Sequence, residues 1–430
     1  MRVDEATEDA DLAALRGRAI QILRTNNRGG YTVPTDNLYP FQWNWDSAFC
    51  AMGVATFDVQ RAWDELDSLY TGQWTNGFLP HIVFHQVVDS YYPGPDVWGA
   101  DHVPRTSGIS QPPITATAAR FILARAGDDR ASRARAAALY PKILALHDWW
   151  DRARDPEASG LVGVLHPWES GADNSPVWDR PLEATPATTT VFHRRDVALV
   201  DAAMRPRQWE YERYIYLVEL YRGLGWDDAR MWAQTPFKVA DVGLNAILQR
   251  DERDLLALAE RFGTPAEQQR LSERAARRRK GLERLWDEEA GAYYSLDLVS
   301  GQSLKIASHA SFLPLWGGLD DPGRAQRLAD ELQRWVDLCA FGAPTMAPDS
   351  PEFDQRRYWR GPVWAIVNWM LGDGLARHGC GELARRLRAD TRRLIQRNGF
   401  CEYYDPLSGE GLGGDTFSWT AAAGLAWAFD

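Results

Sequence analysis

Residues 133–153, RARAAALYPKILALHDWWDRA, are soon followed by residues 160–176, GLVGVLHPWESGADNSP. The first stretch repeats apolar residues at spacings of three and four, which is typical of an amphipathic helix. The second carries two prolines with Ser-Gly and Asp-Asn-Ser between them, and these residues favour an ordered loop. Together the two stretches predict a helical fold whose acidic and aromatic side chains lie in the loops.

The same alternation of helix and loop recurs along the chain. Helical spacing occurs in residues 11–26, 58–74, 114–127, 211–225, 238–263, 265–289, 323–337, 362–379, 381–399 and 419–430. Between these segments, AGAYYSLDLVSGQ (290–302) and GFCEYYDPLSGEG (399–411) form a weak internal repeat. An α-solenoid would have a similar helix content, but it predicts repeats of fixed length, which we do not find. Functional loops gathered at one end favour an all-α fold, an (α/α)6 barrel in a single domain over residues 1–430.

Composition and charge exclude several classes of partner. The net charge of −11 disfavours nucleic acid and anionic membranes, because both would repel the surface. No run approaches the roughly 20 apolar residues of a membrane span, and the acidic first residues do not resemble a signal peptide. The four cysteines, Cys50, Cys339, Cys380 and Cys401, show no metal-binding or disulfide spacing. We therefore expect a cytoplasmic protein without a metal ion or cofactor.

Tryptophan is unusually frequent, with 20 residues against 15 Tyr and 15 Phe. Many lie in polar stretches such as QWNWDS, HPWESG, RRYWRG and FSWTAA. Flat indole faces match the C–H faces of sugar rings, and the indole N–H can serve a hydroxyl group. Tryptophans beside carboxylates in loops therefore indicate a carbohydrate site, whereas Trp149, Trp150, Trp232 and Trp364 are expected in the core.

Several motifs, taken in order, resemble one family. They are YPFQWNWDSAF, GQWTNGFLPHIVF, TSGISQPP, HPWESGADNSP, RPRQWEYERY, YWRGPVW and GFCEYYDPLSGEG followed by FSWTAA. Together they are similar to the bacterial members of glycoside hydrolase family 63 that cleave mannosylglycerate and glucosylglycerate. The resemblance extends over nearly the whole chain. It implies an inverting α-glycosidase on an (α/α)6 domain, without a catalytic metal.

Inverting hydrolysis needs a protonated carboxyl at the glycosidic oxygen and a carboxylate across the sugar ring, roughly 6.5–9.5 Å apart. The resemblance implies Asp173 as the general acid and Glu402 as the general base. Aromatic neighbours are expected to raise the pKa of Asp173 by desolvation. Glu169 is expected to bond the turn or a sugar hydroxyl, and Asp405 and Glu410 are more typical of turn acceptors.

The resemblance also implies the residues that bind the sugar. These are Tyr39, Trp43, Trp45, Asp46, Trp168 and Trp419, with His81 and Gln111 as further contacts. Asp46 could instead be the N-cap of the helix that it precedes. A lone His or Gln in a Pro-rich loop is as often structural as functional.

The other half of such a substrate, glycerate, presents a carboxylate, which a guanidinium can bind through paired N–H groups. The motif RPRQWEYERY (205–214) offers three arginines for this role. The resemblance implies that Arg205, Tyr211 and Tyr214 contact the glycerate. Tyr358 and Trp359 are expected to form a lid over it.

The sequence thus predicts hydrolysis of 2-O-α-D-mannosyl-D-glycerate to mannose and glycerate, with glucosylglycerate as an expected second substrate. A glucosylglycerate-specific hydrolase, another (α/α)6 glycosidase such as a trehalase-like enzyme, and a non-catalytic sugar-binding module stay open as alternatives. The two sugars differ at one hydroxyl, so discrimination depends on few contacts. The apolar Phe417 favours mannose, because we associate the glucosyl-selective branch with a polar residue there.

Overall fold

The computed structural model describes residues 2–36, 38–86, 88, 90–127 and 129–430. In this part of the chain six helices form an inner ring, in which each contacts the next and the last contacts the first. Closure of the ring rules out the α-solenoid. The inner helices are α2 (Asn44–Val54), α5 (Thr115–Arg125), α10 (Val242–Phe262), α12 (Pro314–Gly317), α14 (Ala365–Arg377) and α16 (Ser418–Ala423).

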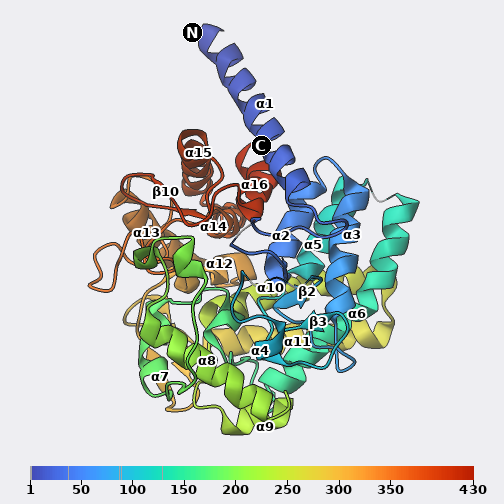
Figure 1. Ribbon diagram of the computed structural model, residues 1–430. Helices are drawn as coiled ribbons and strands as arrows, with labels where there is room; N and C mark the ends of the chain where they lie inside the picture. Colours follow the sequence, from blue (N-terminus) through green and yellow to red (C-terminus); the bar gives the residue numbers. More distant parts are fainter. Residues whose placement is uncertain (1, 37, 87, 89, 128) are drawn as a thin grey trace.

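A second set of helices surrounds this ring (Figure 1). One outer helix precedes each inner helix in the chain, so the fold is an (α/α)6 barrel, as the sequence predicts. The outer helices are α1 (Arg2–Thr25), α3 (Val59–Leu69), α6 (Arg130–Arg154), α11 (Pro265–Glu283), α13 (Pro322–Asp337) and α15 (Gly381–Asn398).

The burial pattern explains why the helices divide into two rings. Every residue of α2 and of α16 is buried, as expected for helices that have neighbours on all sides. By contrast, α6 buries a stripe that includes Leu139, Ile143, Leu146 and Trp150 and leaves its other face to solvent. The inner helices α2 and α16 are therefore enclosed on all sides, whereas the outer helix α6 presents one apolar face to the core.

Three of the four tryptophans expected in the core are fully buried there: Trp149, Trp150 and Trp364. The prediction for Trp232 is wrong. Its ring is only partly buried and lies in a surface groove, where the ammonium of Lys238 sits 4.2 Å from the ring centroid.

Short elements fill the connections between the rings. The short or inserted helices are α4 (Pro95–Trp98), α7 (Asp179–Glu183), α8 (Gln208–Gly223) and α9 (Asp228–Gln234), and single helical turns lie at η1 (Tyr70–Gly72), η2 (Pro167–Ser170), η3 (Pro176–Trp178), η4 (Asp196–Ala198), η5 (Ala202–Met204), η6 (His309–Phe312) and η7 (Gly424–Ala428). In Figure 1 the helices α7, α8 and α9 (green) lie on the side opposite α15 and α16 (red). No helix in the described residues combines the length and the apolar character needed to cross a membrane.

The strands are only two or three residues long and pair antiparallel. They are β1 (Gln42–Trp43), β2 (Ile82–Phe84) and β3 (Arg105–Thr106) in one sheet, β4 (Val239–Ala240), β7 (Ser295–Asp297) and β8 (Gln302–Leu304) in another, and the pairs β5 (Trp286–Asp287) with β6 (Ala292–Tyr293) and β9 (Tyr403–Tyr404) with β10 (Gly411–Leu412). Trp43 pairs with Ile82, which fixes the segment before α2 against the next loop. The helix predicted over 265–289 ends at Glu283, because Trp286 pairs with Tyr293.

The weak internal repeat corresponds to two similar loops. One follows α11 and the other follows α15, and each leads toward an inner helix. In the first, Asp297 accepts a hydrogen bond from the N–H of Val299 (2.9 Å), and in the second Asp405 accepts one from Leu407 (2.8 Å). The sequence similarity therefore reflects a turn that both loops share. Of the two loops, only the second contributes an acidic residue, Glu402, to the cavity described next.

Candidate active site

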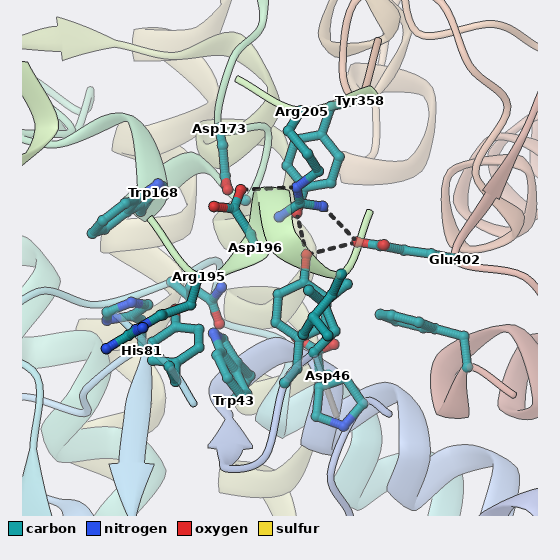
Figure 2. A pocket seen from close by; sticks show the side chains of 18 of the residues that line it. Trp43, Asp46, His81, Trp168, Asp173, Arg195, Asp196, Arg205, Tyr358 and Glu402 are labelled. Carbon is teal, nitrogen blue, oxygen red and sulfur yellow. Dashed lines mark hydrogen bonds and ion pairs between the residues drawn. The ribbon is translucent and has the colours of Figure 1, made fainter. Parts of the chain in front are cut away.

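A cavity lies among the segments that lead into the inner helices (Figure 2). Segments before or at the start of α2, α5, α10, α14 and α16 contribute to its wall. The barrel thus supplies the support and the loops present the side chains. Of the predicted site residues, those that line the cavity are Tyr39, Trp43, Trp45, Asp46, His81, Gln111, Trp168, Asp173, Arg205, Tyr211, Tyr358, Trp359, Glu402 and Trp419.

Asp173 lies in a turn that is fixed on several sides. The chain enters the turn through Gly171, whose φ of +73° suits glycine and whose Cα faces the ring of Trp45 so closely that a Cβ would lie 2.6 Å from it. The carbonyl of Asp173 accepts a hydrogen bond from the hydroxyl of Tyr214 (2.7 Å), and the amide oxygen of Asn174 accepts one from the Trp359 N–H (2.9 Å). These contacts hold the backbone and leave the carboxyl of Asp173 facing the cavity.

Burial raises the pKa of Asp173 to about 7, against the opposing effect of the nearby Arg205 and with help from the charge of Glu402. Apart from the backbone of Asp173 itself, we find no hydrogen-bond partner of its carboxyl group within the described residues. A carboxyl in this environment keeps a proton at near-neutral pH, which is the state that a general acid needs.

Glu402 enters the cavity from the segment before β9, and its backbone N–H donates to the carbonyl of Gly414 (2.7 Å). Its carboxylate accepts hydrogen bonds from the Gly414 N–H (3.0 Å) and the Tyr39 hydroxyl (2.9 Å). Burial raises the pKa of Glu402, while Arg205 and these hydrogen bonds oppose that effect. Figure 2 shows Glu402 and Asp173 reaching the cavity from different segments.

The two other acidic residues of the Glu402 loop have structural partners. Asp405 accepts from the N–H groups of Leu407 and Ser408 (2.8 and 3.1 Å), and Glu410 pairs with Arg356 at 2.6 Å. Neither lines the cavity. Of the acidic residues in this loop, Glu402 alone is placed for chemistry in the cavity.

Arg205 is a buried cation between two carboxylates. Its Nε donates to Asp196 at 3.2 Å, and its Nη1 lies 3.6 Å from Oε1 of Glu402. The guanidinium also lies over the Tyr358 ring, 4.2 Å from the centroid. Nη1 has no hydrogen-bond partner in the described part of the protein. A buried donor of this kind is costly unless a ligand satisfies it.

Asp46 lies in the first turn of α2, which begins at Asn44 with Trp43 as its N-cap, so Asp46 is not the N-cap. Its side chain is buried, and burial raises its pKa well above the usual range, with the charges of Glu402 and Asp173 acting in the same direction. A largely protonated carboxyl can both donate to and accept from sugar hydroxyls.

Aromatic rings form much of the wall. Trp45 meets Trp419 edge to face with centroids 5.5 Å apart, and the Trp419 N–H is buried without a partner among the described residues. Trp359 stacks on Trp364 at 4.0 Å with an interplanar angle of 6°. Trp359 thus forms part of the cavity wall, and the lid of Tyr358 and Trp359 stays a prediction.

His81 and Gln111 also line the cavity, but each has a structural contact. The His81 Nδ1 lies 2.6 Å from the Ser107 hydroxyl, and burial lowers the pKa of His81 well below its usual value. Gln111 accepts a weak hydrogen bond from the Trp45 N–H at 3.4 Å. His81 is therefore a neutral side chain at physiological pH.

Glu169 and Tyr214, both predicted to contact substrate, lie outside the cavity lining. Glu169 accepts from the N–H of Leu165 (2.7 Å) and from Arg154 (3.1 Å), and the side chains of this ion pair are fully buried. Tyr214 donates to the backbone of Asp173. Both residues support the turn that carries Asp173, because their polar groups are already occupied behind it.

The structure adds lining residues that the motifs do not include: Pro34, Leu38, Ser90, Tyr91, Tyr92, Arg195, Asp196 and Leu199. Those after residue 184 belong to a largely exposed connection between α7 and α8. That stretch has no helical or strand periodicity, so pattern analysis gives it no position relative to the site. The sequence feature that could have indicated this stretch is the pair Arg194 and Arg195, because local cations suit an acidic ligand in a chain of net charge −11.

No group of His, Cys, Asp and Glu side chains in the described residues is arranged to hold a metal ion. The expectation of a reaction without metal or cofactor stays a prediction. The chemistry available to the cavity from its own residues is proton transfer by carboxyl groups.

Known proteins resemble this chain over most of its length. The sequence model of the mannosylglycerate hydrolase MGH1-like glycoside hydrolase domain matches residues 39–420. A mannosylglycerate hydrolase of Thermus thermophilus is 49% identical over 414 residues, covering 95% of this chain and 99% of that protein. A glucosylglycerate hydrolase of Mycolicibacterium hassiacum is 38% identical over 435 residues, covering 96% and 97% respectively.

A solved structure gives the same result. The crystal structure of a family 63 mannosylglycerate hydrolase from T. thermophilus in complex with Tris and D-glycerate has a TM-score of 0.94 and 49% sequence identity to this chain, covering 96% of this chain and 99% of that one. The sequence match includes every predicted site residue, and the family identified from the motifs is confirmed. The chain therefore belongs to the mannosylglycerate hydrolase MGH1-like glycoside hydrolases of family 63.

Proposed function

We propose that this enzyme hydrolyses 2-O-α-D-mannosyl-D-glycerate with inversion, releasing mannose and glycerate. The observation that carries the proposal is the arrangement of two carboxyl groups, the half-buried Asp173 and the buried Glu402, on separate segments around one cavity beside a buried arginine. The names of relatives at 49% and 38% identity support a glycosylglycerate as the substrate.

In the proposed reaction the protonated Asp173 gives its proton to the glycosidic oxygen, so glycerate leaves as a neutral alcohol at that position. Glu402 takes a proton from water, which attacks the anomeric carbon from the opposite face of the ring. The raised pKa of Asp173 supports its role as the acid. Burial raises the pKa of Glu402 as well, and Arg205 and the hydrogen bonds from Gly414 and Tyr39 limit that rise.

Arg205 is proposed to bind the carboxylate of the glycerate. The free Nη1 of Arg205 supports this role, since a charged acceptor would satisfy it. Tyr211 and Tyr358 line the same cavity and are proposed as further contacts of the glycerate. A neutral aglycone would leave the buried donor without a partner.

The sugar is proposed to lie among the indoles and Asp46. Trp43, Trp45, Trp168 and Trp419 offer apolar faces, and the unpaired N–H of Trp419 offers a donor for a hydroxyl. His81, Gln111 and Tyr39 complete the proposed set of contacts.

A second candidate is hydrolysis of glucosylglycerate, which the name of the relative from M. hassiacum favours. The two substrates differ at one hydroxyl, so the same site can accept both with different efficiency. The apolar Phe417 in the wall supports a preference for mannose.

We further propose that residues 1–430 act as one catalytic domain, since the wall of the cavity draws on segments from Pro34 to Trp419. A cytoplasmic location is proposed as well. The four cysteines are all unpaired, which suits a reducing compartment.

The test is incubation of the purified enzyme with mannosylglycerate, glucosylglycerate and trehalose, followed by chromatography of the released sugar. We expect mannose to be released fastest, glucose from glucosylglycerate more slowly, and little or no cleavage of trehalose. Efficient cleavage of trehalose with none of either glycerate would contradict the proposal. A non-catalytic binding module would release no sugar from any of them.

A further inference from the structure

The connection between α7 and α8 contributes a second arginine to the cavity. Arg194 and Arg195 are adjacent in sequence and serve different purposes. Arg194 donates to Asp196 (2.6 Å) and lies over the Tyr211 ring, 4.1 Å from the centroid. Arg195 instead lines the cavity. In Figure 2 Arg195 appears on the same side of the view as Trp43 and His81, across from Glu402.

The position of Arg195 is fixed by its neighbours on both sides. Phe192 stacks on Tyr92 with centroids 5.5 Å apart and an interplanar angle of 3°, and it also stacks on Tyr211 at 6.3 Å. Asp196 accepts hydrogen bonds from Arg194 and Arg205. These contacts anchor the backbone of the connection immediately before and after Arg195, and they keep this residue at the wall of the cavity.

The two arginines of the cavity differ in how their charge is compensated. Arg205 is flanked by Asp196 and Glu402, two carboxylates within 3.6 Å. The side chain of Arg195 is exposed at the cavity and makes no hydrogen bond or ion pair with any residue of the described part. The chain carries a net charge of −11, so an arginine beside a site with four carboxyl groups and no pairing of its own is unusual.

An anionic substrate adds one more negative charge to this cavity. Near Arg205 that charge meets the carboxylates of Asp196 and Glu402, whose repulsion offsets part of the attraction. A second cation without an ion-pair partner would restore the net attraction between the cavity and the substrate carboxylate. Arg195 lines the cavity and can supply this cation, and its exposure allows it to meet the anion as the substrate enters.

We propose that Arg195 is a specificity-determining residue that binds the carboxylate of the glycerate together with Arg205. The inference rests on the proposed function, since it assumes a glycosylglycerate as substrate. Arg195 does not take part in proton transfer. Its contribution is to the affinity for the charged aglycone, so it acts on KM and leaves kcat unchanged.

The test compares Arg195→Gln with the wild type on mannosylglycerate and on the uncharged analogue mannosylglycerol. Loss of a charge-assisted contact should raise KM for mannosylglycerate roughly tenfold, with kcat unchanged. The slow cleavage of mannosylglycerol should be the same for both proteins. Arg195→Lys should recover part of the affinity, because an ammonium keeps the charge but not the planar pair of donors.

Arg385→Gln is the matched control, because Arg385 is exposed on α15, outside the cavity lining, and the substitution changes the net charge equally. It should leave both substrates unaffected. Titration calorimetry with D-glycerate gives a second measurement, in which Arg195→Gln should bind more weakly than either the wild type or Arg385→Gln.

The outcomes separate the two proposals. If the wild type released no sugar from any glycosylglycerate, the proposed function would fail. If the wild type cleaved mannosylglycerate and Arg195→Gln did so with the same KM, this inference alone would be overturned. Equal losses on the charged and the uncharged substrate would also overturn it, because Arg195 would then support the loop.

Discussion

Two buried groups of charges in this barrel behave in opposite ways. Between α6, α10 and α11, Glu252 accepts hydrogen bonds from His147 (2.8 Å) and Arg274 (2.6 Å). Burial would raise the pKa of Glu252, but these cations more than offset it and the pKa is lowered. In the cavity, burial raises the pKa of Asp173 to about 7 despite Arg205.

The difference shows that burial alone does not decide the state of a carboxyl group. The cluster of His147, Asp251, Glu252 and Arg274 is closed on all sides by helices, and each carboxylate has donors. Asp173 and Glu402, the proposed catalytic pair, face a cavity and have fewer hydrogen-bond donors between them. A well-compensated group holds the structure together, whereas an under-compensated one is available for proton transfer.

The largest effect should follow from removing the proposed acid or base. Asp173→Asn and Glu402→Gln should each lower kcat roughly 10²–10⁴-fold, the range for loss of a general acid or base. The melting temperature should not fall, because neither change leaves a buried charge unpaired. Steady-state kinetics and thermal unfolding measure the two properties, and near-wild-type kcat in either variant would refute that residue's role.

In the cluster of His147, Asp251, Glu252 and Arg274, a substitution should lower stability and leave turnover almost unchanged. Glu252→Gln removes the buried carboxylate charge that Arg274 and His147 share, leaving only Asp148 beside Arg274 and Asp251 beside His147, and should lower the free energy of unfolding by about 3–5 kcal/mol. At temperatures where the variant is folded, kcat should change little. Glu260→Gln, an exposed change on the same helix α10, is the matched control and should have no measurable effect on denaturant unfolding. Equal stability of the two variants would show that the cluster is not structural.

Arg205 lies between the two kinds of environment, since it is well compensated but keeps a free donor. Arg205→Ala should raise KM for mannosylglycerate by roughly 10- to 100-fold, because a charge-assisted bidentate contact is lost. The effect on uncharged mannosylglycerol should be small. Arg205→Lys should recover only part of the loss. Equal losses on both substrates would assign Arg205 a structural role.

The pH dependence should be the smallest effect within the working range. With a pKa of about 7, Asp173 loses its proton above that pH, and kcat/KM should fall roughly tenfold per pH unit there. The pKa of Asp173 in the folded state is raised, so the folded state binds this proton more tightly, and stability should decrease as pH rises from about 4 to 7.

Asp173→Asn is the control for this pH dependence, because it removes the titrating group. In that variant the part of the stability change that comes from Asp173 should disappear, as thermal unfolding at several pH values would measure. A wild-type kcat/KM that stays constant to pH 9 would contradict the assignment of the acid.

The sequence was sufficient for the barrel and for most of the cavity. Apolar spacing predicts all six outer helices and four of the inner ones, but not the inner helices α2 and α12. The motif resemblance predicts that Asp173 and Glu402 act together although they are distant in the chain. The sequence was insufficient where the role of a residue depends on the direction of its side chain. Glu169 and Asp173 lie in the same short loop, and only their hydrogen bonds separate support from chemistry.

Arg195 and Asp196 illustrate the other limit. They lie in a connection without periodicity, and their position depends on long-range stacking of Phe192 on Tyr92 and Tyr211. Contacts of this kind join segments that local sequence patterns treat as independent. The stacking of Trp359 on Trp364 likewise depends on the tertiary structure.

The most direct test of the central claim is proton NMR of mannosylglycerate hydrolysis during the first minutes of reaction, before the anomers of mannose equilibrate. With Asp173 as acid and Glu402 as base on opposite faces of the ring, β-mannose should appear first and convert slowly to the equilibrium mixture. Initial release of α-mannose would contradict the account, since it requires a retaining mechanism with carboxyl groups only about 5–5.5 Å apart.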